Sequence, residues 1–273
     1  MSQPMRQRAA LRGFSLVELM VSMVIGLVII GAAFSTYLGN RGGARQTAAL
    51  AQVTDDATTA FGILRSQIAM AGYSQPTAVN AAGTLDRRLN GITILGCEGG
   101  FAANAIMTMT PQAVTSVSCE RDTRNASDVF KPDSILVRYE ADMTNTPIVK
   151  NEAEVSRPSD CQGTSIEDDS TLNAAIADNR FRVDTSSAEL ECSGSGLSSQ
   201  VDSNGQPKNR TTDPLVQNIV DMQLTYGMSS TGTGVVDRYV KANDVGLPGT
   251  SGYDTAWQKV VAVRVCLLVR STD

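Results

Sequence analysis

The stretch Arg12-Gly13-Phe14-Ser15-Leu16-Val17-Glu18-Leu19 opens an apolar run that continues to about Leu38. Glu18 is the one carboxylate in that run. A charge at the centre of a bilayer costs about 2.5–3.5 kcal/mol on insertion scales, so such a residue usually has a partner. A cut after Gly13 would give Phe14 a free α-amino group, a cation suited to that role. About 25 residues at 1.5 Å each give about 37 Å, which is enough to span a hydrocarbon core of about 30 Å.

The segment Gly13-Phe14-Ser15-Leu16-Val17-Glu18, preceded by a short basic leader, resembles the class III signal of type IV pilins and type II secretion pseudopilins. The resemblance implies that a prepilin peptidase cuts between Gly13 and Phe14. It also implies that the new amino-terminal Phe14 is methylated and that Glu18 assists filament assembly. An ordinary secretory signal cut near Gly31-Ala32-Ala33 and a simple signal anchor are the competing interpretations, but neither accounts for Glu18 or for Gly13-Phe14.

Composition restricts the classes of function. The chain has 273 residues, of which 42% are hydrophobic, and this suits one domain with a core plus an anchor. The formal net charge is −5; removing residues 1–13, with Arg6, Arg8 and Arg12, lowers Lys+Arg from 23 to 20 against 28 Asp+Glu, which gives −8. This balance argues against a nucleic-acid partner. The leader arginines would keep that end cytoplasmic by the positive-inside rule.

Histidine is absent. Its absence removes the commonest general base, the Ser-His-Asp and Cys-His nucleophile pairs, and His-ligated metal sites, so we expect no enzyme, no cofactor and no metal. Asp168-Asp169, after Glu167, could ligate Ca²⁺, but EF-hand spacing is not present and a solvated acidic loop is the preferred interpretation.

Five cysteines lie in the part of the chain that would be outside the cytoplasm, and none forms a Cys-x-x-Cys pair. Disulfides in an oxidising periplasm account for them better than a zinc or redox site. We expect Cys97 to pair with Cys119 and Cys161 with Cys192, because each pair brackets one loop-rich segment. Cys266 is then a single thiol, expected to react with alkylating reagents only after unfolding, or else its partner lies outside this chain.

Residues 39–72 are predicted to continue the first helix as an amphipathic segment. Gly42-Gly43 predicts a flexible joint before it, and Gly72 followed by Pro76 predicts its end. Polar residues, including Asp56 and Gln67, fall outside its apolar stripe. That stripe, with spacings of three and four, consists of Leu50, Val53, Ala57, Ala60, Phe61, Leu64, Ile68 and Ala71.

Residues 73–273 are predicted to form a β-rich periplasmic domain. The segments Ile219–Met228 and Val260–Val269 alternate with period two, which is typical of half-buried antiparallel strands. The single tryptophan, Trp257, is expected to be a packing residue. The expected fold class is therefore α+β, with a long N-terminal helix packed on an antiparallel sheet. Shorter strand candidates are Gly91–Leu95, Ser134–Tyr139, Phe181–Val183 and Glu189–Cys192.

Four later segments resemble the PilW family of minor pilins in the same order. PilW-like chains normally continue beyond the last of them, so the resemblance implies a C-terminally shortened chain. The complete division is then a leader at 1–13, a transmembrane or filament-core helix at 14–38, its continuation at 39–72 and the globular domain at 73–273. The four segments are Asn179-Arg180-Phe181-Arg182-Val183, Cys192-Ser193-Gly194, Pro214-Leu215-Val216-Gln217-Asn218-Ile219 and Trp257-Gln258-Lys259-Val260-Val261-Ala262-Val263-Arg264-Val265.

The resemblance implies a minor pilin that primes assembly of a type IV pilus and joins its tip, supporting pilus biogenesis, twitching or adhesion. Expected partners are a prepilin peptidase, other minor pilins, the major pilin, the inner membrane and a PilY-type tip adhesin. The expected location is the inner membrane, as a single pass with a cytoplasmic N-terminus, and then the periplasm and pilus tip. A GspJ-like minor pseudopilin of a type II secretion system is the alternative.

Overall fold

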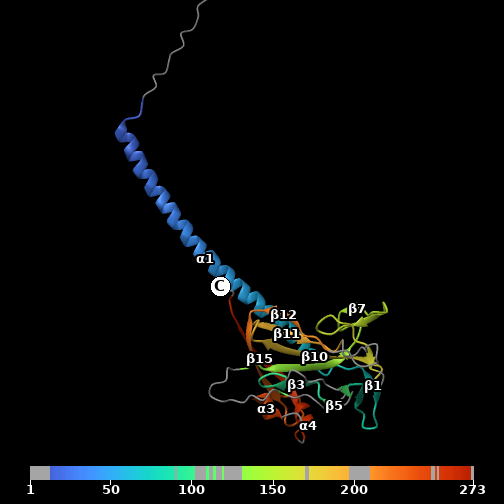
Figure 1. The fold of residues 1–273 in the computed structure, drawn as a ribbon. Coiled ribbons are helices and arrows are strands. Elements are labelled where there is room, and N and C mark those ends of the chain that lie inside the picture. The colour runs from blue at the N-terminus through green and yellow to red at the C-terminus, as the bar shows by residue number, and fades with distance from the viewer. Residues whose placement is uncertain are drawn as a thin grey trace, which may run out of the picture. The chain divides into compact units, whose positions relative to one another are not determined.

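The computed structural model describes residues 13–89, 91–101, 109–110, 113–114, 119, 131–169, 172–196, 210–246, 250 and 252–271. The chain divides into two compact units, Met1–Ala51 and Gln52–Asp273. Helix α1 (Leu16–Met70) begins in the first unit and ends in the second, which also holds every strand (Figure 1). The predicted α+β class is confirmed.

Helix α1 is continuous. No proline occurs between Pro4 and Pro76, so every interior residue keeps its backbone donor. Gly42 and Gly43, where a joint was predicted, are helical, because a glycine costs about 1 kcal/mol of propensity but removes no hydrogen bond. The helix stops as predicted: Gly72 adopts a φ of +76°, and its N–H donates to the Arg138 carbonyl at 2.9 Å.

The larger sheet is antiparallel, with the strand order β12-β11-β10-β6-β3 and β9 also paired to β10. Every residue of β6 is buried, so this strand shows no alternation of exposed and buried side chains. Strand β12 lies at the edge, where Pro214 is tolerated because an edge strand need not donate on both sides. The bounds are β3 (Ile94–Cys97), β6 (Ser134–Ala141), β9 (Asp168–Asp169), β10 (Ala174–Asp184), β11 (Glu189–Ser193) and β12 (Asp213–Gln217).

A three-stranded antiparallel sheet has the order β14-β13-β15, from β14 (Arg238–Val240), β13 (Ile219–Met228) and β15 (Val260–Val269). The period-two prediction for β13 is confirmed at Met222, Leu224 and Tyr226, which are all buried. Register shifts occur at Val220 and Val261. Strict period two would place Val261 on the same inner face as Val263, Val265 and Val269, but Val261 is 45% exposed. A bulge adds one residue to one strand and thereby reverses the faces beyond it.

The remaining elements are short. Helices α3 (Ala242–Val245) and α4 (Tyr253–Trp257) contact each other, and α3 also contacts β3 and β13. Three hairpins join β1 (Pro76–Val79) to β2 (Leu85–Arg87), β4 (Met109–Thr110) to β5 (Ala113–Val114), and β7 (Ile148–Lys150) to β8 (Ser156–Pro158).

One apolar core joins the second half of α1 to both sheets. Ala60 and Leu64 enter it as predicted, whereas Leu50 is 69% exposed and Phe61 is 42% exposed. The predicted stripe was wider than the face that the sheet covers.

Trp257 is a packing residue, as expected. Its ring meets Tyr226 edge-on with centroids 4.9 Å apart, and its Nε1 donates to the Gly246 carbonyl at 2.9 Å. The Tyr226 hydroxyl lies so close to Gly96 that a Cβ at that position would collide with it. Residue 96 must therefore be glycine for the aromatic pair to sit in this place.

Candidate functional site

The start of α1 is closed by a reciprocal cap. The Ser15 hydroxyl oxygen accepts the Val17 N–H at 3.2 Å, and the Glu18 carboxylate accepts the Ser15 N–H at 3.4 Å. Ser-x-x-Glu at a helix start is the capping-box spacing, in which two orphan donors are satisfied. The sequence-based prediction for Glu18, pairing with an α-amine, does not include this cap, although the spacing of Ser15 and Glu18 indicates it.

The apolar part of α1 is exposed on all sides within the described chain. An 18-residue window has a mean hydropathy of 2.4 with none of its residues buried, so the helix is long and apolar enough to cross a membrane. Its hydroxyls are satisfied internally: Ser22 donates to the Glu18 carbonyl at 2.7 Å, and Thr36 donates to the Ala32 carbonyl at 2.8 Å. Such bonds remove the cost of placing a hydroxyl in hydrocarbon. Gly13 and Phe14 are exposed and precede the helix.

Two polar contacts fix the second half of α1 to the globular unit. Asn218 donates to the Asp56 carboxylate at 2.8 Å. The Gln67 side-chain oxygen accepts from Asn179 at 2.7 Å and from the Tyr139 hydroxyl at 3.3 Å. Both α1 residues had been placed outside the buried stripe, because periodicity alone assigns polar residues to solvent.

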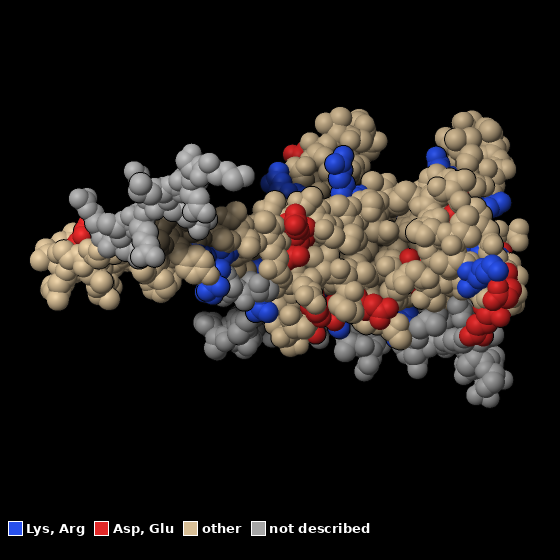
Figure 2. Space-filling view, turned by 90° about the horizontal axis from the view of Figure 1, so that it is seen from above, with Lys and Arg blue, Asp and Glu red and all other residues tan. Residues whose placement is uncertain are grey.

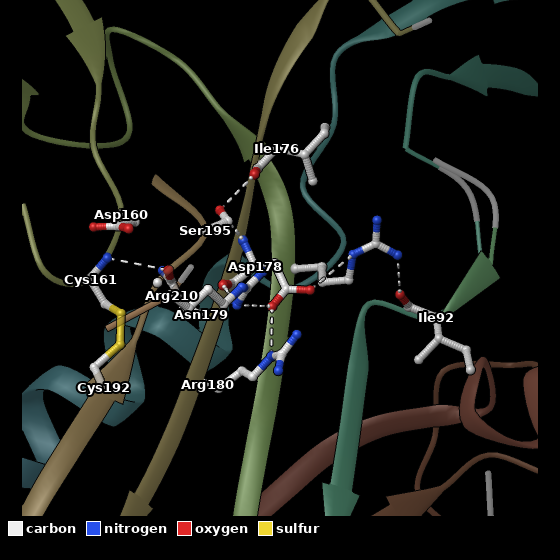
Figure 3. Close-up of polar contacts among 12 residues, drawn as sticks. Ile92, Asp160, Cys161, Ile176, Asp178, Asn179, Arg180, Cys192, Ser195 and Arg210 are labelled. Carbon is white, nitrogen blue, oxygen red and sulfur yellow. Dashed lines mark hydrogen bonds and ion pairs between the residues drawn. A yellow bond between two sulfur atoms is a disulfide. The ribbon is translucent and has the colours of Figure 1, made fainter. Parts of the chain in front are cut away.

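A buried ionic cluster occupies the centre of the larger sheet (Figure 3). Asp178, whose side chain is fully buried, pairs with Arg210 at 2.8 Å, with Arg180 at 3.2 Å and with Arg138 at 3.9 Å. Burial alone would raise the pKa of Asp178, but Arg210, Arg180 and Arg138 together lower it to about 2. The acid is therefore charged at neutral pH. It links β6 through Arg138, its own strand β10 through Arg180, and the loop segment at Arg210.

The disulfides join the pairs expected from the sequence: Cys97 to Cys119 and Cys161 to Cys192. Their Cα atoms lie 5.3 Å and 6.4 Å apart, within the range that a disulfide permits. The second bond lies beside the ionic cluster (Figure 3), where Asn179 accepts the Cys161 N–H at 3.3 Å. Cys266 is exposed, so the expectation that it reacts only after unfolding is wrong. It lies on the outer face of β15, opposite Gln223.

Charged groups elsewhere are dispersed. On the face seen in Figure 2, Lys and Arg alternate with Asp and Glu in small groups rather than forming one broad patch. Arg157 lies within 3.2 Å of Glu167 and 2.6 Å of Asp168, which accounts for the acidic segment considered for Ca²⁺. Within the described ranges, no group of three or more His, Cys, Asp or Glu side chains could hold a metal ion.

Comparison with known families gives two matches. The model of the prokaryotic N-terminal methylation motif matches residues 9–34, and the model of type IV pilus-assembly protein W (PilW) matches residues 180–273. No curated protein and no solved structure matched the chain. The first match covers the capped start of α1, and the second covers the last five residues of β10 and β11 to β15. The motif implies processing by a prepilin peptidase and association with other pilins. At opposite ends of one α+β chain, these regions match the N-terminal methylation motif and the PilW family, and this combination matches a type IV minor pilin.

Proposed function

We propose that this minor pilin primes assembly of a type IV pilus and is incorporated at the pilus tip. The observation that carries the proposal is the position of Glu18, a carboxylate in the first turn of α1, at the start of the apolar and exposed part of that helix. A helix of this kind needs apolar surroundings, either lipid or a bundle of similar helices. The globular unit at its other end is stabilised by disulfides, as suits a domain that works outside the cytoplasm.

Processing is the first step of this function. Cleavage between Gly13 and Phe14 would leave Phe14 as an amino terminus one residue before the helix cap at Ser15. Methylation of that amine keeps its positive charge. Before cleavage the chain would cross the inner membrane once with its N-terminus in the cytoplasm, and after assembly its globular unit would lie in the periplasm or at the tip.

Glu18 would then have two tasks. Its Oε2 accepts the Ser15 N–H over a long 3.4 Å, so the carboxylate remains able to pair with a Phe14 amine, its own or a neighbour's. At 4 Å such a pair gains about 1 kcal/mol in water and about 4 kcal/mol at an effective dielectric of 20, which is an upper range here. Burying either charge alone would cost several kcal/mol, so the pair favours helices that dock in register.

Each proposed partner protein would contact one of two parts of this chain, the apolar part of α1 or the globular unit. Other minor pilins and the major pilin would pack on the apolar part of α1, where Gly26 and Gly31 leave open space for close approach. The family resemblance adds a PilY-type adhesin, which we propose to bind the globular unit.

The test uses a strain that lacks the gene, complemented with wild type, Glu18→Gln or Ser15→Ala. Glutamine preserves the capping-box acceptor but removes the charge, whereas Ser15→Ala removes half of the cap and keeps the charge. We expect the Glu18→Gln chain to be cleaved normally. It should co-purify with fewer partner pilins than the Ser15→Ala chain does, and its strain should carry fewer surface pili.

A correctly cleaved Glu18→Gln chain that restores the full number of pili would contradict this role of Glu18. Normal piliation of the deletion strain together with loss of type II secretion would contradict the pilus function and support the pseudopilin alternative.

A further inference from the structure

Helix α1 carries two arginines just beyond its apolar part. Between Glu18 and Asp55, the charged residues of the helix are Arg41 and Arg45 alone. At 1.5 Å per residue, Arg41 lies about 35 Å along the helix axis from Glu18, which slightly exceeds the hydrocarbon thickness of about 30 Å. A helix that spans a bilayer with Glu18 at one surface therefore carries Arg41 into the headgroup layer of the other surface.

The two arginines share one face of α1 with an aromatic ring. Tyr37, Arg41 and Arg45 are spaced by four residues, so they follow one another along one side of the helix, and we call these three residues the basic stripe. The Arg41 Cζ lies 5.1 Å from the centroid of the Tyr37 ring, which is a cation–π contact. Such stacking uses the flat face of the guanidinium and leaves its N–H groups able to donate to an anion.

No nearby acid on α1 offsets the charge of the basic stripe. Both arginine side chains are exposed, and among the described residues neither forms an ion pair. The next acid along the helix, Asp55, lies about 15 Å beyond Arg45, which exceeds the Debye length of about 8 Å at physiological ionic strength. The stripe is therefore a local double positive charge directly beside the apolar part of the helix. The anionic group that a bilayer presents at this depth is the phosphate of its headgroups.

We propose that the basic stripe binds the phosphate of an anionic phospholipid at the outer surface of the inner membrane. Arginine donates two parallel N–H bonds to phosphate oxygens, and a tyrosine ring is suited to the depth of the headgroups. The contact holds α1 at a fixed depth in the bilayer before partner helices take it up. This proposal rests on the membrane-spanning precursor described under the proposed function, but it does not depend on which filament the chain joins.

Cleavage of the leader increases the importance of the stripe. The precursor carries three further arginines in its leader, which attract anionic lipids at the cytoplasmic surface. A cut after Gly13 removes all three, and the segment from Phe14 to Ala51 then keeps Arg41 and Arg45 as its only Lys or Arg residues. After the cut, the stripe and the new Phe14 amine are the cationic groups that remain at the two surfaces of the bilayer.

The test measures which lipid the purified full chain retains. Protein in detergent is titrated with phosphatidylglycerol or with phosphatidylcholine of the same acyl chains, and bound lipids are counted by native mass spectrometry. We expect wild type to prefer phosphatidylglycerol. The double variant Arg41→Gln/Arg45→Gln should reduce this preference about five- to 25-fold, since each arginine near an anionic lipid surface contributes about fivefold. Tyr37→Leu keeps both charges but removes the stacking ring, and it should reduce the preference about two- to fivefold.

Arg65→Gln is the matched control, because it removes the same side chain from an exposed position of α1 about 30 Å beyond Arg45. We expect it to keep the wild-type lipid preference, and the fluorescence of the buried Trp257 should show unchanged folding in every variant.

Two results would overturn the lipid site: an equal phosphatidylglycerol preference in wild type and the double variant, or an equal loss in Arg65→Gln. A double variant that keeps the lipid preference but loses its partner pilins would also overturn it, and would assign the stripe to a protein contact. Normal piliation of the deletion strain would contradict the pilus function alone, because the lipid preference is measured on the isolated chain.

Discussion

Asp178 is the acid that the arginines of the buried cluster share, and its carboxylate is fully buried. Asp178→Asn would leave these arginines without their common counter-charge, so we expect a loss of about 3–5 kcal/mol in the free energy of unfolding, measured by urea denaturation. Glu154→Gln, which breaks the exposed pair with Lys150, is the matched control and should cost less than about 1 kcal/mol. Similar losses in both variants would show that the buried cluster is not a special source of stability.

The pKa of Asp133 is shifted upward, in the opposite direction to that of Asp178. It lies between the sheets, where its N–H donates to the Met222 carbonyl and its carboxylate accepts the Leu224 N–H, both at 2.8 Å. Burial, which outweighs the bond from Leu224, raises its pKa from 3.8 to about 6. Between these values the folded state keeps a proton that the unfolded state loses, so Asp133 makes stability fall as pH rises from about 4 to about 6.

Asp133→Asn tests this sign, because asparagine retains the acceptor for Leu224 but cannot titrate. We expect the variant to lose less stability than wild type between pH 4 and pH 6, in urea denaturation at matched ionic strength. Asp178 acts in the other direction and over a lower range, since its depressed pKa of about 2 contributes stability that is lost below about pH 4. Parallel pH profiles for wild type and Asp133→Asn would rule out the buried titration.

At the scale of elements, only a narrow face of the second half of α1 is buried in the core. Leu64 is 1% exposed in the core, whereas Phe61, three residues earlier, is 42% exposed. Leu64→Ala should therefore cost about 2–5 kcal/mol through lost burial and a cavity, and Phe61→Ala should cost clearly less. The comparison uses thermal or urea unfolding of the full chain in detergent. A larger loss at Phe61 than at Leu64 would mean that the helix presents a different face to the sheet.

The elements also show what the sequence could predict. The β13 alternation from Met222 to Tyr226 and the stop at Gly72 follow from local chemistry, and both are confirmed. The polar contacts of the half-buried Gln67 depend on Tyr139 and Asn179, which lie far along the chain, and no local pattern carries that information. The burial of Arg138 and Asp178 within strands follows from mutual pairing, whereas hydropathy assigns such residues to solvent.

At the scale of the whole molecule, the two matched regions lie at opposite ends of the chain, residues 9–34 and residues 180–273. The first is an apolar helix start with one acid, and the second supplies β13 and β15 as well as two of the clustered arginines, Arg180 and Arg210. Glu18 already accepts the Ser15 N–H, but it gains a cationic partner nearby only if the chain is cut after Gly13, because that cut creates the Phe14 α-amine. The proposed role of Glu18 in assembly therefore depends on cleavage after Gly13.

The most direct test is the intact mass of the full-length product extracted from membranes of cells that carry a prepilin peptidase. We predict the mass of a chain that begins at Phe14, carries one methyl group and lacks four hydrogens because of the Cys97–Cys119 and Cys161–Cys192 disulfides. A peptidase-deficient strain is the control and should give the uncut chain. A product that keeps Met1 in the presence of the peptidase, or that begins near Phe34, would contradict the account.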